Sequence, residues 1–368
     1  MRILYDHQVF SLQDTGGGAR YYYGLLRYLA GLPNIQTELL LGINNSMYPL
    51  RELAAAGTDV KAWSASLRPG IWRYALNEIL SNCVAPFCGM ADVYHPTSYR
   101  CMPLVRARRI VITHHDCAYE RFPELFPSAA RVLPAKKRLF AQADAISCVS
   151  ESSRKDLLQF YAVDAAKTRV IHHGITPLPR CPAIARKLQR ELRREYLLYV
   201  GSRPSYKNFT GLLRAFRESG LCQVLDLLVL GGGSLTSEER ALITNLGLSD
   251  SVVTLPEVSD EFLGAAYAAA KLFVYPSRWE GFGFPPLEAM AAGCPVLASN
   301  TSSIPEVCLD APFYFDPYDQ ASFAHALLCA VHDEDARRKA IDRGGKVAAQ
   351  YTWEKCGAKT LALYRDCQ

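Results

Sequence analysis

The chain has 368 residues, of which 49% are apolar and 21% charged, and its formal net charge is +5. These values exclude a disordered chain, a collagen-like chain and a small disulfide scaffold. At roughly 150 residues per domain, the length predicts about two domains, each large enough to enclose its own hydrophobic core.

The twelve cysteines form no C-x-x-C pair, which argues against a zinc ribbon or a redox motif. Most lie inside apolar runs, so the simplest interpretation is buried free thiols in a reducing cytosol. Asp6 and His7 interrupt the first apolar stretch, so no signal peptide is expected, and no run reaches the roughly 18 apolar residues of a spanning helix. We therefore expect a cytoplasmic protein, with the inner face of the plasma membrane as the second location.

Charge is unevenly distributed along the chain. Residues 1–180 hold 21 Lys and Arg against 14 Asp and Glu, whereas residues 181–368 hold 20 against 22. A basic first half suits an anionic partner such as lipid headgroups, a lipid-linked phosphate or nucleic acid, and the alternative is a merely soluble surface. Nucleic acid is disfavoured because no recognition module or aromatic stacking platform is evident.

Apolar strand-like runs alternate with helical patterns through the first half. The expected strands are residues 1–6, 37–41, 92–95, 109–113, 145–149 and 169–172, and an amphipathic helix is expected over 19–32, directly after three glycines. Continuous apolar strands separated by helices indicate a parallel sheet that is covered on both faces.

Three prolines within residues 176–182 predict a linker, after which the pattern restarts. Strands are expected at 196–200, 225–230, 252–255, 272–275 and 295–298, and the tail from residue 351 is expected to form one amphipathic helix. The fold class is therefore α/β, with two doubly wound Rossmann-like domains, 1–180 and 181–350, and a helix at 351–368. Such domains bind ligands at the carboxyl ends of their strands, here in a cleft between the two.

The strongest motif is SRWEGFGFPPLEAMAAG, residues 277–293, which follows an expected strand. Gly281 and Gly283 allow a tight turn and close approach of a ligand, and Pro286 suits the first position of a helix whose N–H groups would bind an anion. Glu280 in the loop and Glu288 in the first helical turn suit hydroxyl recognition on either side of a pyrophosphate. The alternative for Glu288 alone is an acid that stabilises the helix dipole.

This string resembles the Glu-x7-Glu motif of retaining glycosyltransferases with the two-domain GT-B fold, in particular glycosyltransferase family 4. The resemblance extends along the chain through five further segments: TGGGARY at 15–21, THHD at 113–116, VSESS at 149–153, VIHHGI at 170–175 and YVGSRPSYKN at 199–208. It implies that the C-terminal helix packs back on the N-terminal domain, which binds the acceptor, and that the C-terminal domain binds a nucleotide sugar.

A departing nucleoside diphosphate carries about two negative charges, which many transferases neutralise with a metal held by Asp-x-Asp. The one such string here, Asp333-Glu334-Asp335, is interpreted as a solvated helix start. Without a metal, fixed cations must stabilise the leaving group, and the resemblance assigns this task to Arg203 and Lys207. No cofactor or metal is therefore expected.

By the same resemblance, Glu280 holds hydroxyls of the donor sugar, Glu288 holds the ribose hydroxyls, and His115 lies beside the donor sugar and stabilises the transition state. Three consecutive glycines at 16–18 bring backbone close to the donor phosphate or the acceptor, and the alternative is a flexible loop. The implied catalytic residues are His115, Arg203, Lys207 and Glu280. The implied donor-binding residues are Gly17, Gly18, Arg203, Lys207, Glu280, Gly281, Phe282, Gly283, Phe284, Leu287 and Glu288.

Two basic groups on the first half are candidates for contact with an anionic membrane. One is Arg106, Arg108 and Arg109, and the other is Arg131, Lys136, Lys137 and Arg138, beside apolar residues of the same helix. The alternative is a solvated helix face above its core stripe.

The sequence thus predicts retaining, metal-independent transfer of a sugar from a nucleoside-diphosphate sugar, GDP-mannose as first choice, to a glycan or lipid-linked acceptor in surface polysaccharide synthesis. UDP- and dTDP-sugars remain open as donors. The rivals are a 2-epimerase or phosphorylase of the same architecture, and a catalytically inactive protein that binds sugar nucleotides.

Overall fold

The structure is a computed structural model that describes residues 1–13, 16–43, 48–63, 70–99, 105–192, 194–256 and 258–367. The chain divides into two compact units, of which unit 1 contains Met1–Gly174 and Thr352–Gln368 and unit 2 contains Ile175–Tyr351. Each unit is built on one parallel β-sheet, so the α/β fold class with two Rossmann-like domains is confirmed.

Unit 1 contains a seven-stranded sheet in the order β3-β2-β1-β4-β5-β6-β7. Its strands are β1 (Arg2–Asp6), β2 (Gln36–Ile43), β3 (Asp59–Trp63), β4 (Ala91–His95), β5 (Ala107–His114), β6 (Ala145–Cys148) and β7 (Thr168–Val170). Its helices are α1 (Gln8–Leu12), α2 (Gly17–Ala30), α3 (Leu50–Ala55), α4 (Ile71–Val84), α5 (Ala118–Arg121), α6 (Ala129–Gln142), α7 (Glu151–Phe160) and α16 (Trp353–Asp366). The short 3-10 turns are η1 (Ala85–Phe87), η2 (Pro123–Leu125) and η3 (Ala165–Lys167).

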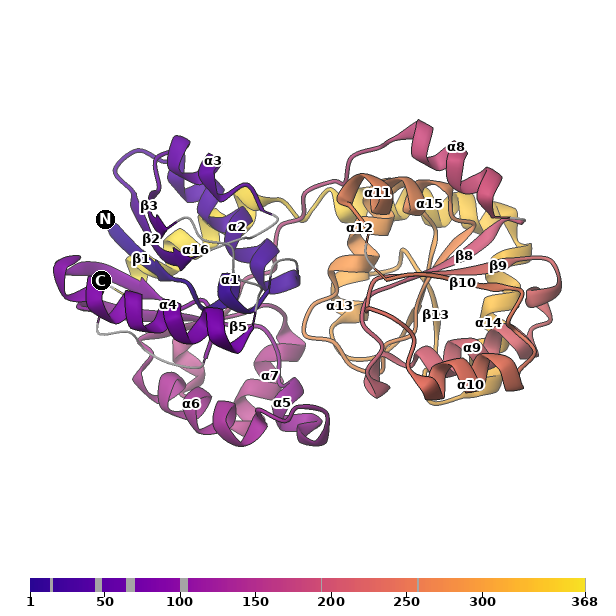
Figure 1. Cartoon of the computed structure of the whole chain (residues 1–368), viewed down its shortest axis with the longest axis horizontal. Coiled ribbons are helices and arrows are strands. Elements are labelled where there is room, and N and C mark those ends of the chain that lie inside the picture. The colour runs from indigo at the N-terminus through magenta and orange to yellow at the C-terminus, as the bar shows by residue number, and fades with distance from the viewer. Residues whose placement is uncertain are drawn as a thin grey trace. The chain divides into compact units, whose positions relative to one another are not determined.

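Unit 2 contains a six-stranded sheet in the order β10-β9-β8-β11-β12-β13. Its strands are β8 (Tyr196–Val200), β9 (Asp226–Leu230), β10 (Val252–Leu255), β11 (Leu272–Tyr275), β12 (Val296–Ser299) and β13 (Phe313–Phe315). Its helices are α8 (Pro182–Glu191), α9 (Phe209–Glu218), α10 (Ser237–Asn245), α11 (Asp260–Ala269), α12 (Phe284–Ala292), α13 (Ile304–Cys308), α14 (Gln320–His332) and α15 (Glu334–Ala348), with 3-10 turns η4 (Ser205–Lys207) and η5 (Leu221–Gln223). Within this unit, α8, α11, α12 and α15 lie on one side of the strands and α9, α10 and α14 on the other (Figure 1).

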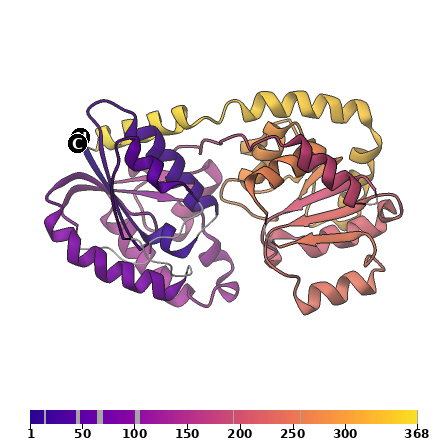
Figure 2. The ribbon, with the colours of Figure 1, turned by 45° about the horizontal axis from the view of Figure 1, so that its top comes forward.

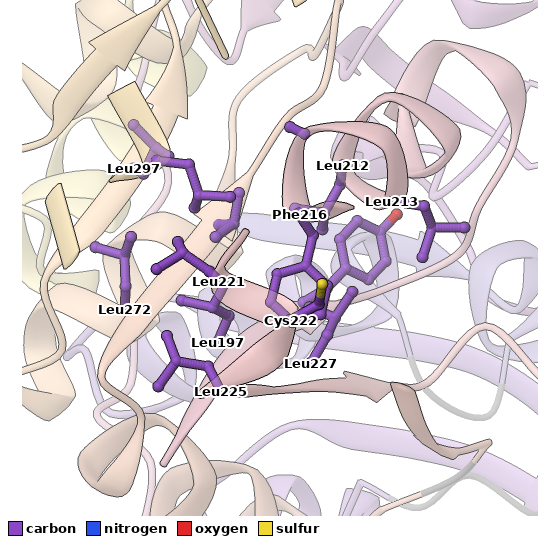
Figure 3. Close-up of a cluster of buried hydrophobic side chains, with 14 of the residues drawn as sticks. Leu197, Leu212, Leu213, Phe216, Leu221, Cys222, Leu225, Leu227, Leu272 and Leu297 are labelled. Carbon is purple, nitrogen blue, oxygen red and sulfur yellow. The ribbon is translucent and has the colours of Figure 1, made fainter. Parts of the chain in front are cut away.

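The core of unit 2 is a cluster of leucine and phenylalanine side chains between the sheet and α9 (Figure 3). Leu212 and Phe216 of α9 are fully buried and belong to the same cluster as Leu197 of β8 and Leu227 of β9. Because α9 begins directly after the loop that follows β8, this packing fixes the position of that loop.

The sequence analysis did not predict strands β3 and β13, and both lie at sheet edges. β3 has charged residues at Asp59 and Lys61, and β13 is only three residues long. Edge strands are commonly short and polar, so a search for continuous apolar runs overlooks them. The Asp333–Asp335 string is a helix start, as interpreted, because the Asp333 side chain caps α15 by accepting from the backbone N–H of Ala336 at 2.8 Å.

Helix α16 belongs to unit 1, although the rest of that unit is built from the first 174 residues. In Figures 1 and 2 this yellow helix lies beside the indigo helix α2, with which it is in contact. The two helices approach through glycines. A Cβ atom at Gly24 would lie 2.3 Å from Trp353 ring carbons, and one at Gly357 would lie 2.0 Å from Cδ1 of Tyr28.

A buried hydrogen-bond chain secures the far end of α16. The Tyr364 hydroxyl lies 2.7 Å from the hydroxyl of Tyr5 and 2.6 Å from Nδ1 of His95, and Nε2 of His95 lies 2.9 Å from Oγ1 of Thr113. Burial lowers the pKa of His95 to about 3, so its imidazole is neutral at pH 7. A neutral ring can donate from one nitrogen and accept at the other, as this chain of partners requires.

Candidate active site

The chain order in unit 2 reverses at the border between β8 and β11. From β8 the chain proceeds outward to β9 and β10, and it then returns to β11 on the other side of β8. In doubly wound sheets, ligands bind outside the carboxyl ends of the strands at such a switch point. The loops that follow β8 and β11 hold Arg203, Lys207 and Glu280, so the topology brings these three candidate residues to one edge of the sheet.

Lys207 and Glu280 form an ion pair between these two loops. The Lys207 Nζ atom lies 2.5 Å from Oε1 of Glu280, and the two side chains are 19% and 11% exposed. The ammonium group also lies 5.7 Å from the ring centroid of Tyr275, the last residue of β11. Burial, and secondly the charge of Glu280, raise the pKa of Tyr275 well above its ordinary value. The site therefore presents one cation and one carboxylate, with the uncharged Tyr275 ring next to the cation.

Serines that follow β12 hold the backbone around Glu280. The backbone N–H of Glu280 donates to the Ser302 hydroxyl at 2.9 Å, and the Ser303 hydroxyl donates to the carbonyls of Glu280 at 3.0 Å and Phe282 at 2.9 Å. The conformation of the Glu280 loop is thus set by a third loop. The sequence analysis missed these serines, although a Ser/Thr/Asn cluster at 299–303, directly after an expected strand, was a usable signal.

Arg203 is almost buried, and its guanidinium group holds a glycine loop. Nε donates to Glu239 at 2.9 Å, Nη1 donates to the Gly231 carbonyl at 2.9 Å, and Nη2 donates to the carbonyls of Gly233 and Ser234 at 3.0 Å each. Glycines 231–233 all have φ between 73° and 77°, which side-chain-bearing residues rarely adopt. Arg203 therefore holds a left-handed glycine loop that follows β9, a contact that its motif did not predict.

Helix α12 begins at Phe284, two residues earlier than expected. Pro285 and Pro286 are thus its second and third residues, and Glu288 is the fifth, so Glu288 lies beyond the first turn. The reason is that Gly283, with φ of 114°, already acts as the N-cap. Two prolines without N–H groups leave fewer donors for an anion at this helix end than the sequence suggested.

The remaining donor-binding candidates differ in how they could meet a ligand. The Leu287 side chain is fully buried and that of Glu288 is largely buried, whereas Gly281 and Phe284 are partly exposed. Leu287 therefore packs in the unit, and only its backbone could serve a ligand. The backbone of residues 281–284 lies beside the Lys207–Glu280 pair because it continues directly from Glu280.

In unit 1, His115 is the first residue after β5. Its backbone N–H donates to the Tyr99 hydroxyl at 3.1 Å, and its ring lies edge-on to that of Tyr21, with centroids 5.3 Å apart. Its Nε2 atom is buried and has no hydrogen-bond partner among the described residues. Burial, assisted by the positive charge of Lys136, lowers the pKa of His115 to about 4. His115 is therefore a neutral ring at pH 7 with one unused nitrogen.

Gly17 and Gly18 do not form the loop that the sequence suggested. Both belong to the first turn of α2, and Gly16, with φ of 150°, precedes them as the N-cap. A Cβ atom at Gly18 would lie 3.1 Å from Cγ2 of Val9, so the helix start packs closely on α1. Gly16 can adopt this φ because it lacks a Cβ. Thr15 lies outside the described residues.

The prediction of a second exposed basic group was wrong for one of its four residues, Lys136. Lys136 is fully buried, its ammonium group lies 2.7 Å from Oε1 of Glu120, and it donates to the Asp116 carbonyl at 2.9 Å. It also faces the Tyr99 ring, whose centroid is 4.9 Å away. This lysine is an internal cation and cannot reach a membrane surface. Arg131, Lys137 and Arg138 of α6 are exposed.

Within 1–13, 16–43, 48–63, 70–99, 105–192, 194–256 and 258–367, no three His, Cys, Asp or Glu side chains gather as metal ligands would. Over the same ranges, no helix combines the length and apolarity needed to cross a bilayer.

Family models match both halves of the chain. The model described as "Glycosyltransferase Family 4" matches residues 15–177, and the model described as "Glycosyl transferases group 1" matches residues 182–347. Their border lies within the proline-rich segment 176–182. The matched ranges include the loops that carry His115, Arg203, Lys207 and Glu280.

Two relatives of this chain are named as mannosyltransferases. The chain is 34% identical over 272 residues to O-antigen chain mannosyltransferase B from Escherichia coli, and the match covers 71% of each chain. It is 27% identical over 258 residues to O-antigen chain mannosyltransferase RfbU from Salmonella typhimurium, covering 70% of this chain and 69% of that one.

Several solved structures have a similar fold over nearly the whole chain. WaaG, described as a glycosyltransferase involved in lipopolysaccharide biosynthesis, superposes with a TM-score of 0.74 at 17% identity, covering 97% of this chain and 98% of that chain. HepE from Anabaena, solved with UDP and glucose, superposes with a TM-score of 0.74 at 19% identity, covering 98% and 99%. At these identities the likeness concerns the fold.

Proposed function

Since the chain belongs to glycosyltransferase family 4, we propose that it transfers a mannosyl residue from GDP-mannose to a glycan or lipid-linked acceptor in surface polysaccharide synthesis, with retention of the anomeric configuration. The choice of mannose is supported by the names of the relatives, two of which are O-antigen chain mannosyltransferases. GDP as the nucleotide is supported by the resemblance of the motif at 277–293. A UDP- or dTDP-sugar is the alternative donor.

The Lys207–Glu280 pair is the observation that carries this proposal. The pair joins the two loops at the switch point of the nucleotide-binding type of sheet, at 2.5 Å. A donor with a diphosphate and a sugar needs a cation for the first and a hydroxyl acceptor for the second, and these are the two groups present. In the free protein each group neutralises the other, so neither is left as an isolated buried charge before the donor arrives.

Arg203 is proposed to act in two ways. Its hydrogen bonds to the 231–234 carbonyls hold the glycine loop in place for the nucleotide. A guanidinium group has five N–H donors, and the contacts described above leave one Nη1 hydrogen for a phosphate oxygen. Arg203 would therefore add positive charge near the diphosphate while it holds the loop. Lys207 would be the cation that contacts the phosphate directly.

In the proposed reaction, the diphosphate departs from and the acceptor attacks the same face of the sugar ring. The bond from the anomeric carbon to the diphosphate oxygen breaks with its electron pair staying on the diphosphate, and the acceptor hydroxyl oxygen forms the new bond from the same side. The departing diphosphate takes the acceptor's proton, so atoms and charge balance without a metal. His115, neutral because of its lowered pKa, would contribute a hydrogen bond to the donor sugar and no charge.

Thermal unfolding with a panel of nucleoside diphosphates and their sugars, without metal, tests the donor. A ligand at 100 times its Kd adds about 2.7 kcal/mol to the free energy of unfolding, which is a clear shift. We expect GDP and GDP-mannose to respond, and a response to UDP or dTDP ligands alone would replace the donor. The nucleotide sugar that stabilises the protein is then incubated with mannan-type acceptors. The anomeric configuration of the product is determined by NMR. An inverted product would overturn the retaining proposal.

Metal independence has its own test. Transfer is measured after extensive dialysis against EDTA and again after addition of Mg²⁺ or Mn²⁺. We expect equal rates, because the cations of the site are side chains. A complete loss that metal restores would show that the diphosphate is neutralised in another way.

A further inference from the structure

Helix α4, whose ribbon is labelled in Figure 1, buries polar side chains and exposes apolar ones, the reverse of an ordinary surface helix. Arg73, Asn77 and Ser81 are buried, and Arg73 donates to the carbonyls of Phe10 at 2.7 Å and Ser11 at 3.1 Å. Asn77 donates to the Ile43 carbonyl at 2.8 Å and accepts from its N–H at 2.6 Å. The polar side chains of α4 are therefore used to attach the helix to α1 and β2.

The opposite face of α4 presents apolar side chains to the outside. Trp72 is 83% exposed, Ile79 is 61% exposed, and Phe87 of the following turn η1 is 89% exposed, with Leu76 and Met90 beside them. Trp72, Leu76 and Ile79 follow one another at four and three residues, the spacing of one α-helical face, and Phe87 and Met90 come after the end of α4. Between residues 72 and 90, none of the exposed side chains is charged. From Trp72 to the end of α4 this face runs about 18 Å, at 1.5 Å per residue.

Arginines border the end of this apolar face. The backbone N–H of Ala91, next to Met90, donates to the Arg106 carbonyl at 2.9 Å, so the exposed side chain of Arg106 lies at that end. Arg108 is also exposed, and Nη1 of Arg2 donates to the Met90 carbonyl at 3.3 Å. Arg2 is partnered by Glu38, and Arg108 lies 3.9 Å from Asp92, whereas Arg106 has no acidic partner among the described residues.

We propose that the apolar face of α4 and η1 inserts into the interfacial layer of an anionic lipid bilayer, with Arg106 and Arg108 on the phosphate headgroups. A helix with tryptophan and aliphatic side chains on one face and basic residues at its border has the composition of an interfacial helix. The arginines add electrostatic attraction to anionic lipid. This inference goes beyond the proposed sugar transfer and does not depend on it.

A second copy of this chain is the competing occupant of the face, and the charges disfavour it. Symmetric association would place the same surface against itself, so the arginines of both copies would come to one interface. Like charges at an interface repel, whereas anionic headgroups attract them.

Vesicle co-sedimentation of the full-length protein tests the proposal. The probes are vesicles of phosphatidylcholine alone and vesicles with 30% phosphatidylglycerol. We expect binding to the anionic vesicles that weakens between 0.1 and 0.5 M NaCl. Ile79→Glu should lower the partition coefficient at least about tenfold, because it places a charge in the apolar face. The matched control is Val224→Glu, which adds the same charge at an exposed apolar residue of unit 2 and should leave binding unchanged.

Fluorescence locates the contact. Brominated lipid should quench the wild-type tryptophan emission, and Trp72→Phe should remove most of that quenching. Absence of vesicle binding, or equal losses in Ile79→Glu and Val224→Glu, would overturn the proposal. A dimer in ultracentrifugation without vesicles that Ile79→Glu dissociates would also overturn it in favour of a second copy. The thermal response of each variant to nucleotide is recorded in parallel, so failure of membrane binding is separated from failure of the donor site.

Discussion

Replacing Lys207 by methionine removes the ammonium group while it keeps most of the side-chain length. We expect two separate losses. The free energy of unfolding falls because the Glu280 carboxylate is left in the site without a counter-charge. Sugar transfer falls because the leaving diphosphate loses the cation that we assign to it.

The structure sets the size of both effects. Removing one partner of a fully buried ion pair costs about 3–5 kcal/mol, and of an exposed pair about 0–1 kcal/mol. With side chains 19% and 11% exposed, the Lys207–Glu280 pair lies between these limits, and we expect a loss of about 2 kcal/mol. Loss of one fixed group that stabilises developing charge lowers kcat by about 10²–10³-fold.

Urea unfolding and initial rates of transfer separate the two losses in a set of three variants. Lys207→Met combined with Glu280→Gln removes both charges, so stability should return to within about 1 kcal/mol of the wild type while transfer stays as low as in Lys207→Met. Lys271→Met is the matched control. Lys271 directly precedes β11, and its ammonium group lies 2.6 Å from the largely exposed Glu195, which directly precedes β8. It should change neither stability nor rate appreciably.

A Lys207→Met protein that transfers sugar within threefold of the wild-type rate would refute the assignment. So would a double variant that regains transfer together with stability, because then the pair would serve the fold alone.

Arg203→Lys should raise the KM for the donor about tenfold with a smaller change in kcat, because an ammonium group cannot replace the planar fork that holds the glycine loop; a fall in kcat alone, in steady-state kinetics, would contradict this. The pKa of His115, about 4 when folded, lies below its ordinary 6.5, so between these values the unfolded chain binds the extra proton and stability falls as the pH falls. Urea unfolding at pH 7, 6 and 5 should therefore show a slope that is smaller in His115→Gln, by a difference that approaches about 1.4 kcal/mol per pH unit between pH 6 and 5, and equal slopes would refute the buried neutral ring. Gly24→Ala should lower the free energy of unfolding by about 1–3 kcal/mol, because its Cβ would lie 2.3 Å from the Trp353 ring. The control Gly345→Ala, where a Cβ meets nothing within 4 Å, should be neutral or stabilising, and equal effects of the two would refute the close approach.

The sequence predicted the sheets well because their central strands are buried on both faces. Such strands are continuous apolar runs, and the run that became β11 and the loop after it were both recognised from their residues. The switch point between β8 and β11 could not be predicted from the runs themselves, since strand order depends on how the helices pack. It emerged only with the pairing of Leu272 with Leu197.

Side-chain roles were less predictable than their positions. The string around Lys136 is basic and amphipathic, and nothing in it announces that this one lysine turns inward to Glu120, a residue of another helix. The same holds for Arg203, whose acceptors are carbonyls some thirty residues later in the chain. Backbone carbonyls carry no sequence signal, so contacts of this kind are visible only in the folded structure.

The orientation of α4 could not be predicted from the sequence either. Its sequence has apolar residues at helical spacing, which ordinarily predicts a face turned toward the core. Burial of Arg73 and Asn77 decided the opposite orientation, because their partners are backbone groups of α1 and β2.

The contribution of α16 to unit 1 has a consequence for synthesis. The ribosome makes the first 174 residues of this unit, then all of unit 2, and only then the helix that carries Trp353 and Tyr364. Unit 2 is contiguous and can fold during translation, whereas the partners of α16 on α2, β1 and β4 stay uncovered until the end.

A nascent chain that stops at Tyr351 would thus hold a finished second unit and an unfinished first one. Its uncovered aromatic rings and the surface around Gly24 would form the kind of exposed apolar surface that chaperones bind and proteases cleave. Unit 1 therefore buries these residues only after unit 2 and helix α16 have both been made.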